Sequence, residues 1–436
     1  MRSYRSWGGY PQATHTRILP VVWRSEPPAL ERVSETVLPY AYGRSYGDSC
    51  LNDGGALLDV SGLDRLIAFD EVNGLLRCEA GVTLAAILAV TVPQGWFLPV
   101  VPGTRWVSVG GAIANDIHGK NHHRAGTFGR HVTQFELLRS NGERILCSAT
   151  QNTALFRATI GGLGLTGLIL WAEFRLKQIA GSGISLQRIR FCGLDEFFEL
   201  SMSDQQHEYT VAWVDCLARG RRLGRGIFMR GDHVPFRGRS PLPLQSTKLG
   251  VPCDAPRGLL NRLSLRVFNT LYYRRHLRAA AQSTIPYVPF FFPLDGIADW
   301  TRLYGSAGLV QYQCVVSADP IAGQVRALLD RVSRSEETPT LAVLKCFGPI
   351  PSPGMLSFPR EGVTLAVDFR FRGRRTLELL NDLDRVVLEA GGAVYPAKDA
   401  RMSSESFRKF FPQWESFAGL LDPKFSSSFW RRVHPV

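Results

Sequence analysis

The sequence has no closely spaced pair of cysteines and no long hydrophobic run. Its eight cysteines are scattered along 436 residues without a CxxC motif or a metal-ligand spacing, which is typical of reduced thiols in a reducing compartment. Nowhere do 18 uncharged apolar residues follow one another, and the first residues continue into Trp7-Gly-Gly-Tyr10 rather than into an apolar stretch. We therefore expect a cytoplasmic protein with neither a signal peptide nor a membrane-spanning helix.

Acidic residues are scarce in one segment, and this scarcity explains the net charge of the chain. Between Leu217 and Ala280, fourteen Lys and Arg residues stand against only Asp232 and Asp254, so this segment carries +12 of the formal +13. The remainder is close to neutral and contains no zinc-finger, RNP or basic-zipper signature. We therefore expect no nucleic-acid partner.

The length of the chain and a change in its pattern of apolar runs and loops predict two domains. A single core rarely grows beyond about 250–300 residues. Up to residue 178, short apolar runs alternate with glycine-rich turns, which is typical of an α+β domain. From 179 to 391, longer strands alternate with loops and helices. The elements expected with the clearest patterns are strands at 56–60, 75–79, 135–138, 209–214 and 309–316, and a helix at 84–92.

The basic segment contains a loop and an amphipathic helix. Residues 234–256 are rich in Pro, Gly and Arg and predict a mobile loop. Residues 258–280 then place Leu260, Leu263, Val267, Phe268 and Leu271 at helical spacing, with arginines between them. This helix could lie on an anionic bilayer surface. The simpler interpretation, preferred from the sequence alone, is an ordinary amphipathic helix packed on its domain.

The glycines of Gly162–Gly167 match the GxGxxG pattern of nicotinamide-binding proteins, but their context does not. That fingerprint requires a strand before the glycines and a helix after them. Here residues 153–159 have a helical pattern and residues 168–174 have a strand pattern. The reversed order argues against a Rossmann NAD site.

Two further loops could cradle a cofactor. Gly43-Arg-Ser-Tyr-Gly-Asp48 is short, whereas Val101–Lys120 is long and carries Gly103, Gly110 and Gly111. Glycines let the backbone approach a ligand closely and present its N–H groups. The second loop ends near His118 and His122, whose spacing could suggest a metal. The glutamate of the HExxH zinc motif is replaced by glycine, so we predict no metal site.

These loops resemble the FAD-binding domain of the vanillyl-alcohol oxidase superfamily, and more closely the decaprenylphosphoryl-β-D-ribose 2′-oxidases of cell-wall arabinan synthesis. The similarity runs along nearly the whole chain. The resemblance implies an α+β fold with a two-subdomain FAD-binding domain (1–178), completed by a C-terminal segment (392–436). It also implies a substrate domain (179–391) that has an antiparallel sheet flanked by helices and a mobile basic loop at 217–280. The most specific motifs are Gly43–Asp48, His118–His123, Gln311–Gln313 and Tyr395–Asp399.

Carried over residue by residue, the resemblance implies a cofactor site and a substrate site. The residues expected at FAD are Gly43, Arg44, Ser45, Tyr46, Gly47, Asp48, Gly103, Thr104, Ser108, Val109, Gly110, Gly111, Asn115, Asp116, Ile117, His118, Ile169 and Tyr395. The residues expected at the substrate are Lys120, Trp213, Gln311, Gln313, Lys345 and Lys398. Flavin-tethering relatives have a histidine where this chain has Tyr46, so we predict that FAD is bound non-covalently.

The resemblance also implies the reaction and the partners. The expected substrate is a polyprenyl-phosphate pentose, a ribose whose 2′-hydroxyl is oxidised to the 2′-keto sugar. A separate NAD(P)H-dependent keto-sugar reductase would complete the epimerisation to arabinose. Such a lipid substrate, together with the basic segment, predicts peripheral contact with the inner face of the cytoplasmic membrane. One departure is Thr364-Leu-Ala-Val-Asp368, where relatives have Asn-Ile-Cys-Val-Asp, so compounds that need the cysteine thiol should not react at Ala366.

The chemistry leaves the choice of base open. Alcohol oxidation removes a hydride, which a flavin accepts, and a proton, which needs an acceptor near the hydroxyl. Lys398 is the first candidate, with Tyr395 beside it, and His118 is the alternative. Burial and neighbouring cations could lower the pKa of Lys398, yet the lysine could equally act as a hydrogen-bond donor that never titrates. Lys120 and Lys345 could balance a phosphodiester or be ordinary surface charges.

Two other functions remain as alternatives. The first is a soluble alditol or aldonolactone oxidase of the same flavin superfamily, which needs no lipid. The second is a basic membrane- or nucleic-acid-binding protein whose glycine loops are only structural. In the same way, the aromatic runs at 272–273 and 290–292 could either line a prenyl-chain path or belong to the core.

Overall fold

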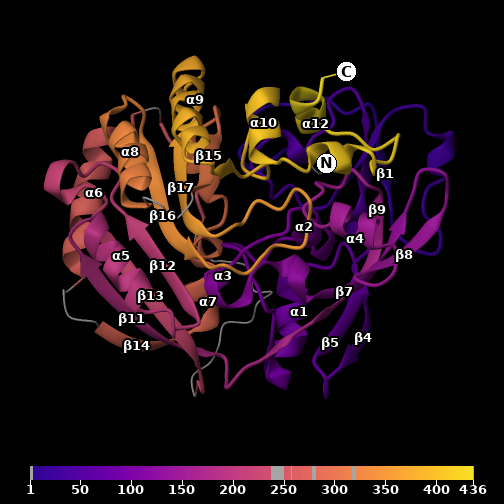
Figure 1. The fold of residues 1–436 in the computed structure, drawn as a ribbon, viewed down its shortest axis with the longest axis horizontal. Helices are drawn as coiled ribbons and strands as arrows, with labels where there is room; N and C mark the ends of the chain where they lie inside the picture. The colour runs from indigo at the N-terminus through magenta and orange to yellow at the C-terminus, as the bar shows by residue number, and fades with distance from the viewer. Residues whose placement is uncertain (1–2, 237–249, 257, 277–280, 317–320, 436) are drawn as a thin grey trace.

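The protein is represented by a computed structural model that describes residues 3–236, 250–256, 258–276, 281–316 and 321–435. Figure 1 shows two parts side by side, one built from the indigo and purple N-terminal strands with the yellow C-terminal helices, the other around a larger sheet. Helices and largely antiparallel sheets are mixed in both parts, and the fold is α+β. The chain between 237 and 249, which holds most of the expected mobile loop, lies outside the described residues.

The N-terminal part contains two main sheets. A three-stranded sheet pairs its strands in parallel in the order β1-β3-β2, and a five-stranded antiparallel sheet has the order β4-β5-β9-β7-β8. Their bounds are β1 Ile18–Pro20, β2 Val37–Tyr40, β3 Ala56–Asp59, β4 Leu66–Asp70, β5 Leu75–Glu79, β7 Val132–Leu138, β8 Arg144–Ser148 and β9 Leu168–Arg175. The short pair β6 Trp96–Phe97 and β10 Lys177–Gln178 and the helices α1 Leu84–Thr91, α2 Val109–Ala114, α3 His122–Ala125 and α4 Thr153–Thr159 complete this part.

The second part is built on an eight-stranded sheet in which every neighbouring pair is antiparallel. Its order is β14-β11-β13-β12-β16-β17-β15-β18. The strands are β11 Gly183–Phe191, β12 Tyr209–Val214, β13 Gly226–Val234, β14 Ala281–Pro286, β15 Leu309–Val316, β16 Pro339–Phe347, β17 Gly362–Arg370 and β18 Ala393–Val394. The helices α5 Leu194–Ser203, α8 Ile321–Arg334 and α9 Arg374–Glu389 cover the face that is toward the viewer in Figure 1.

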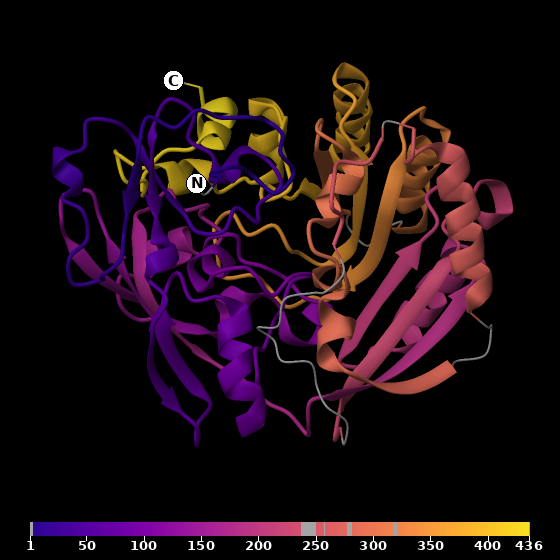
Figure 2. The same cartoon turned by 180° about the vertical axis from the view of Figure 1, so that it is seen from behind.

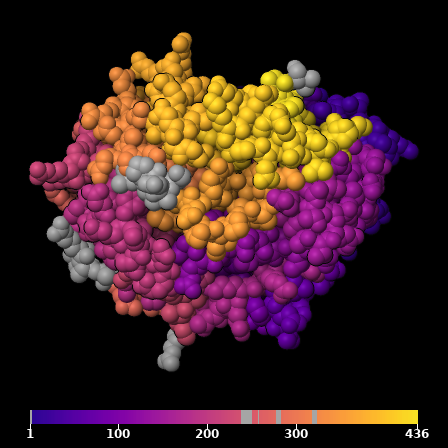
Figure 3. All heavy atoms as spheres, viewed as in Figure 1, coloured from indigo at the N-terminus to yellow at the C-terminus, as the bar shows by residue number. Residues whose placement is uncertain are grey.

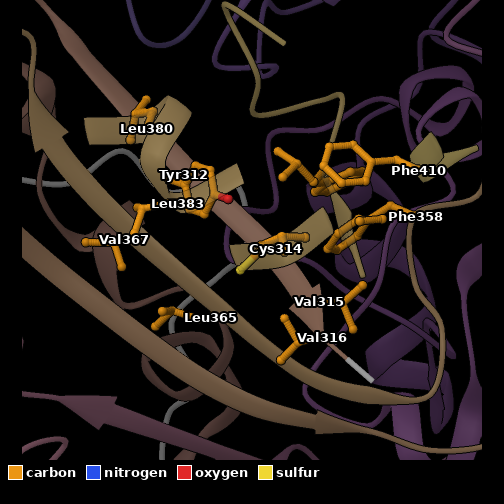
Figure 4. Packing of buried hydrophobic residues seen from close by; sticks show 14 of the residues in the cluster. Tyr312, Cys314, Val315, Val316, Phe358, Leu365, Val367, Leu380, Leu383 and Phe410 are labelled. Carbon is orange, nitrogen blue, oxygen red and sulfur yellow. The ribbon is translucent and has the colours of Figure 1, made fainter. Parts of the chain in front are cut away.

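Strand alternation decides what each face of this sheet carries. Tyr312 and Cys314 of β15 point toward α9 and pack near its Leu380 and Leu383 (Figure 4), together with Val367 of β17. Because successive side chains of a strand point to opposite faces, the intervening polar residues of β15 and β17 face the other way. Apolar residues of α9 recur at helical spacing and bury one stripe on the sheet. The sheet therefore has one apolar face under the helices, and on the opposite face β15 and β17 carry polar side chains.

The C-terminal segment returns to the N-terminal part. Its helices are α10 Ser404–Phe410, α11 Trp414–Ala418 and α12 Ser428–Val433. Arg432 of α12 pairs with Asp48 at 2.7 Å and with Asp399 at 3.0 Å, both carboxylates being buried. In Figure 3 the yellow atoms of this segment lie directly against purple and indigo atoms. The contact joins the end of the chain to its first glycine loop.

Several local predictions are confirmed. The strands expected at 209–214 and 309–316 are β12 and β15, and the reversed order around GxGxxG is present as α4 before the glycines and β9 after them. The helix expected at 258–280 is α6 Arg262–Arg275, with 277–280 outside the described residues. None of the described helices is long and apolar enough to cross a membrane. The domain limits stay a prediction, and β18 extends the large sheet to Val394.

Candidate active site

A cavity of about 710 Å³ lies between the glycine loops of the N-terminal part and the polar face of the large sheet. This volume lies within the range of roughly 300–1,000 Å³ of ordinary ligand pockets. One wall comes from residues 42–46 and 101–120, and the opposite wall comes from β12, β15, β16 and β17. Tyr395 and Lys398, from the C-terminal segment, close one side.

The first glycine loop is held in place by close backbone approaches. Gly43 has a φ of +60°, a conformation that favours glycine, and a Cβ there would lie 2.2 Å from the Tyr40 hydroxyl. A Cβ on Gly47 would lie 1.6 Å from the carbonyl oxygen of Asp399. The amide of Tyr46 also donates to the carbonyl of Ala397 at 2.9 Å. The loop is thereby pressed against the C-terminal segment.

The long loop is fixed at its middle and at its end. Ser108 caps α2, because its hydroxyl accepts from the amide of Gly111 at 3.2 Å. The Tyr395 hydroxyl donates to the carbonyl of Asn115 at 2.8 Å. Phe358 stacks on the Tyr395 ring, with the ring centroids 4.6 Å apart. Burial raises the pKa of Tyr395 far above its ordinary value, so this hydroxyl is a hydrogen-bond donor and not a base.

The backbone lining this wall suits a flat, phosphate-bearing cofactor such as FAD. Gly103 has no atom within 4 Å of the position that a Cβ would take, so its bare backbone borders open space. Glycine backbone of this kind can present N–H groups to phosphate or to a ring system. The expected cofactor residues that line the cavity are Gly43, Arg44, Ser45, Tyr46, Gly103, Thr104, Ser108, Gly110, Gly111, Asn115, Ile117, His118 and Tyr395.

Five of the expected cofactor residues do not line the cavity, namely Gly47, Asp48, Val109, Asp116 and Ile169. Gly47 and Asp48 are engaged with the C-terminal segment, as described above. Val109 and Ile169 are buried in the hydrophobic core. The carboxylate of Asp116 accepts from the Gly129 amide at 2.8 Å and from the Ser357 hydroxyl at 2.5 Å.

His118 of the long loop contacts residues of the large sheet on the opposite wall. Its Nε2 lies 2.8 Å from Nε2 of Gln313, and its Nδ1 lies 3.2 Å from Nζ of Lys345. Gln313 also donates to the Thr364 hydroxyl at 3.1 Å. Burial, and then the nearby charge of Lys345, hold the pKa of His118 well below its ordinary value. The imidazole is therefore neutral at physiological pH.

Three partly buried lysines line the cavity, and removal of the ammonium group from solvent is the main cause of the low pKa of each. The pKa of Lys120 is lowered to about 7, that of Lys345 to about 8 and that of Lys398 to about 7. Repulsion from Lys345 lowers the pKa of the other two further. Within the part of the chain that the structure describes, none of the three forms an ion pair with a carboxylate. The Lys120 ammonium instead donates to the carbonyl of Phe291 at 3.1 Å.

A carboxylate that was not among the residues predicted from the sequence, that of Asp368, acts on Lys398. Its Nζ lies 3.8 Å from the centre of the Tyr46 ring, and the negative charge of Asp368 raises its pKa against the effect of burial. Gln311 donates to Asp368, and burial raises the pKa of Asp368 to about 6. Asp368 stands directly opposite Gln311 in the pairing of β15 and β17. Alternation along Thr364–Asp368 places Asp368 on the same face as Thr364 and Ala366, and this local pattern could have drawn attention to it.

The outer part of the cavity is apolar. Trp213, one of the expected substrate residues, lines it and meets the Tyr272 ring at 4.8 Å. Phe290 and Phe291 are buried in the core and also line the cavity, so their place in the core is confirmed and a prenyl-chain path beside them stays a prediction. All six expected substrate residues thus reach the same cavity. Aliphatic side chains of the large sheet complete this outer region, namely Leu186, Val211, Met229 and Ile285.

Comparisons with known proteins agree with this geometry. Residues 30–148 match the FAD binding domain family. The chain is 37% identical over 430 residues to a decaprenylphosphoryl-β-D-ribose oxidase of Mycolicibacterium smegmatis, covering 95% of this chain and 92% of the relative. It is 36% identical over 372 residues to an uncharacterised protein of Streptomyces coelicolor, covering 81% and 100%. A human Δ(24)-sterol reductase is 30% identical over 111 residues, only 26% of this chain and 22% of the reductase.

Proposed function

The chain belongs to the decaprenylphosphoryl-β-D-ribose oxidase family of FAD-binding proteins, and from this premise we propose that it oxidises the 2′-hydroxyl of a polyprenyl-phosphate ribose to the 2′-keto sugar. The chain is an FAD-dependent oxidoreductase. The observation that carries the proposal is one cavity lined both by the glycine loops and by three partly buried lysines, Lys120 of the long loop, Lys345 of β16 and Lys398 of the C-terminal segment. A soluble alditol oxidase would have no need for three amines in its cavity, because its substrate carries no phosphate.

FAD supplies the hydride acceptor that no side chain can provide. The thirteen expected residues that line the cavity, twelve from the glycine loops and Tyr395, would hold the FAD. The five expected residues that do not line it would stabilise the conformation of the loops. Tyr46 is the residue at the position where flavin-tethering relatives have histidine. Its pKa is raised far above normal by burial, so its phenol is not a nucleophile at neutral pH. FAD is therefore held without a covalent bond.

Lys398 is the base that takes the proton of the sugar hydroxyl. A general base works best when its pKa lies near the working pH, and the pKa of Lys398 is about 7. His118, with a pKa well below its ordinary value, holds a proton poorly and acts instead by positioning Gln313 and Lys345. Lys120 and Lys345 face the phosphodiester, where two amines can balance its charge.

The reaction and the chain composition imply further partners. The 2′-keto product needs a separate NAD(P)H-dependent reductase to complete the change from ribose to arabinose. A prenyl-linked substrate resides in a membrane, so the protein works as a peripheral protein at the inner face of the cytoplasmic membrane.

The same function divides the chain into two domains. Residues 1–178 and 392–436 form the FAD-binding domain, and residues 179–391 form the substrate-binding domain.

Anaerobic bleaching of the bound flavin tests the function. Polyprenyl-phosphate ribose should bleach the flavin, whereas free alditols and aldonolactones should not. Bleaching by free alditols alone would favour the soluble oxidase. The variant Lys398→Met should retain FAD but reduce the bleaching rate by about 10²–10⁴-fold, the usual contribution of a general base. Unchanged bleaching in this variant would remove the lysine from the proton transfer.

A further inference from the structure

The helix α6 carries an exposed apolar stripe. Leu263, Val267 and Leu271, each one helical turn apart, are 74%, 54% and 65% exposed, and Phe268 beside them is 58% exposed. The preference for a helix that packs its apolar side chains on the domain is therefore wrong for these four. Contiguous exposed apolar surface of this kind marks an interaction site more often than scattered single residues do.

The opposite side of α6 is firmly attached. The amide of Asn269, which is buried, donates to the Asp215 carboxylate at 2.8 Å. Arg262 donates to the carbonyl of Ser333 at 2.6 Å, and Asn261 forms a capping box with Ser264 at the start of the helix. These contacts fix the rotation of α6, so the apolar stripe is held outward.

The charges around the stripe are of one sign. Helix α6 contains no acidic residue, and Arg266, Arg274 and Arg275 are exposed on it. Within the described ranges, none of these three arginines forms an ion pair. Contact between two copies of α6 would bring these like charges together, which opposes self-association. An anionic surface that also accepts aliphatic side chains is the complementary partner.

The stripe is continuous with the mouth of the cavity. Phe268 belongs to the stripe and also lines the cavity, and Tyr272 follows it inward toward Trp213. Figure 1 labels α6 at the side of the large sheet, and Figure 2 shows this salmon-coloured helix from behind, on the side away from the N-terminal strands. One helix thus borders both the outer surface and the apolar region of the cavity.

We propose that α6 lies on the surface of an anionic lipid bilayer, inserting Leu263, Val267 and Leu271 while its arginines contact the lipid headgroups. The prenyl chain of the substrate then passes from the bilayer over Phe268 and Tyr272 into the cavity. The docking step follows from the helix itself, whereas the path of the prenyl chain rests on the proposed function.

Vesicle flotation of the flavin-loaded full chain tests the docking. The protein should float with vesicles of phosphatidylcholine and phosphatidylglycerol, and less with phosphatidylcholine alone. The variant Leu263→Ser/Val267→Ser/Leu271→Ser should bind at least about tenfold more weakly, because three inserted aliphatic side chains are lost. The matched control Val72→Ser/Met202→Ser, which removes exposed apolar side chains elsewhere, should bind like the wild type.

A second pair of variants tests the role of the arginines of α6 in binding anionic lipid. Arg274→Gln/Arg275→Gln should lose the preference for anionic vesicles, whereas Arg374→Gln/Arg375→Gln, an exposed pair on α9, should retain it. Absence of wild-type flotation, equal flotation of the triple serine variant, or equal losses in the controls would overturn the proposal. So would a dimer that the serine variant converts to monomers. The flavin absorbance per protein shows whether each variant is folded. Bleaching of the flavin by a short-chain phosphopentose shows whether the oxidation itself still occurs without a membrane. A failure of docking can therefore be told apart from a failure of the proposed function.

Discussion

Replacing Asp368 by asparagine should move the pH dependence of flavin reduction to lower pH. Burial lowers the pKa of Lys398 to about 7, the charge of Asp368 opposes this effect, and Lys345 adds to it. Without the carboxylate charge, the pKa of Lys398 falls further. A base must be unprotonated to act, so the rate of reduction rises as the pH passes the pKa of Lys398. A lower pKa therefore places this rise at a lower pH.

The size of the displacement follows from the contact between the two groups. A neighbouring opposite charge changes a pKa by about 1–3. Asp368 and Lys398 form no direct ion pair, and Gln311 holds one carboxylate oxygen of Asp368, so the low end of that range applies. We expect the midpoint of the rise to move down by about one pH unit, which corresponds to about 1.4 kcal/mol.

The assay is the rate of anaerobic flavin bleaching at saturating substrate, measured across neutral pH. Asp254→Asn, which removes an exposed acid of the basic segment, is the control and should leave the profile in place. Flavin content per protein shows that both variants keep the cofactor. An unmoved or upward-moved midpoint in Asp368→Asn would refute the electrostatic coupling. A rate that falls as the pH rises through 7 would show that Lys398 donates rather than accepts.

Three further outcomes are expected. Acid precipitation should release all flavin into the supernatant, because Tyr46 offers no covalent link, and a yellow pellet would contradict this. Arg432→Leu should lower the free energy of unfolding by about 3–5 kcal/mol, because buried Asp48 loses its cation and buried Asp399 keeps only the more distant Arg401, and a denaturant midpoint like that of the wild type would contradict it. Gly47→Ala should lose FAD, since its Cβ would meet the Asp399 carbonyl oxygen at 1.6 Å, whereas Gly296→Ala, with nothing within 4 Å, should bind FAD normally.

The parts of the fold that depend on local patterns could be predicted from the sequence. Runs of β-branched and aromatic residues placed β12 and β15 with correct ends, because each strand is bounded by polar or glycine-rich turns. The reversed order around Gly162–Gly167 needed only the periodicity on each side of the glycines. These features require no knowledge of which segments meet in space.

The arrangement of the site could not be predicted in the same way. His118 and Lys345 are 227 residues apart, and their contact depends on how the glycine loops pack on the large sheet. The resemblance gave these residue names, but no local pattern gives their distance. In α6, periodicity identified the apolar stripe, yet it cannot say whether that stripe faces protein or solvent, because both arrangements use the same spacing.

The three partly buried lysines of the cavity are together suited to an anionic ligand. Removing an ammonium group from water is unfavourable, and burial accordingly lowers the pKa of Lys120, Lys345 and Lys398 toward neutrality. A phosphodiester beside Lys120 and Lys345 would favour their charged forms, so binding of the substrate and protonation of these two amines are coupled. Lys398 differs from them because the chain supplies its own counter-charge in Asp368. Under the proposed function, the cavity would keep two amines charged for the phosphate, while Lys398, with its pKa near neutrality, would accept the proton of the hydroxyl.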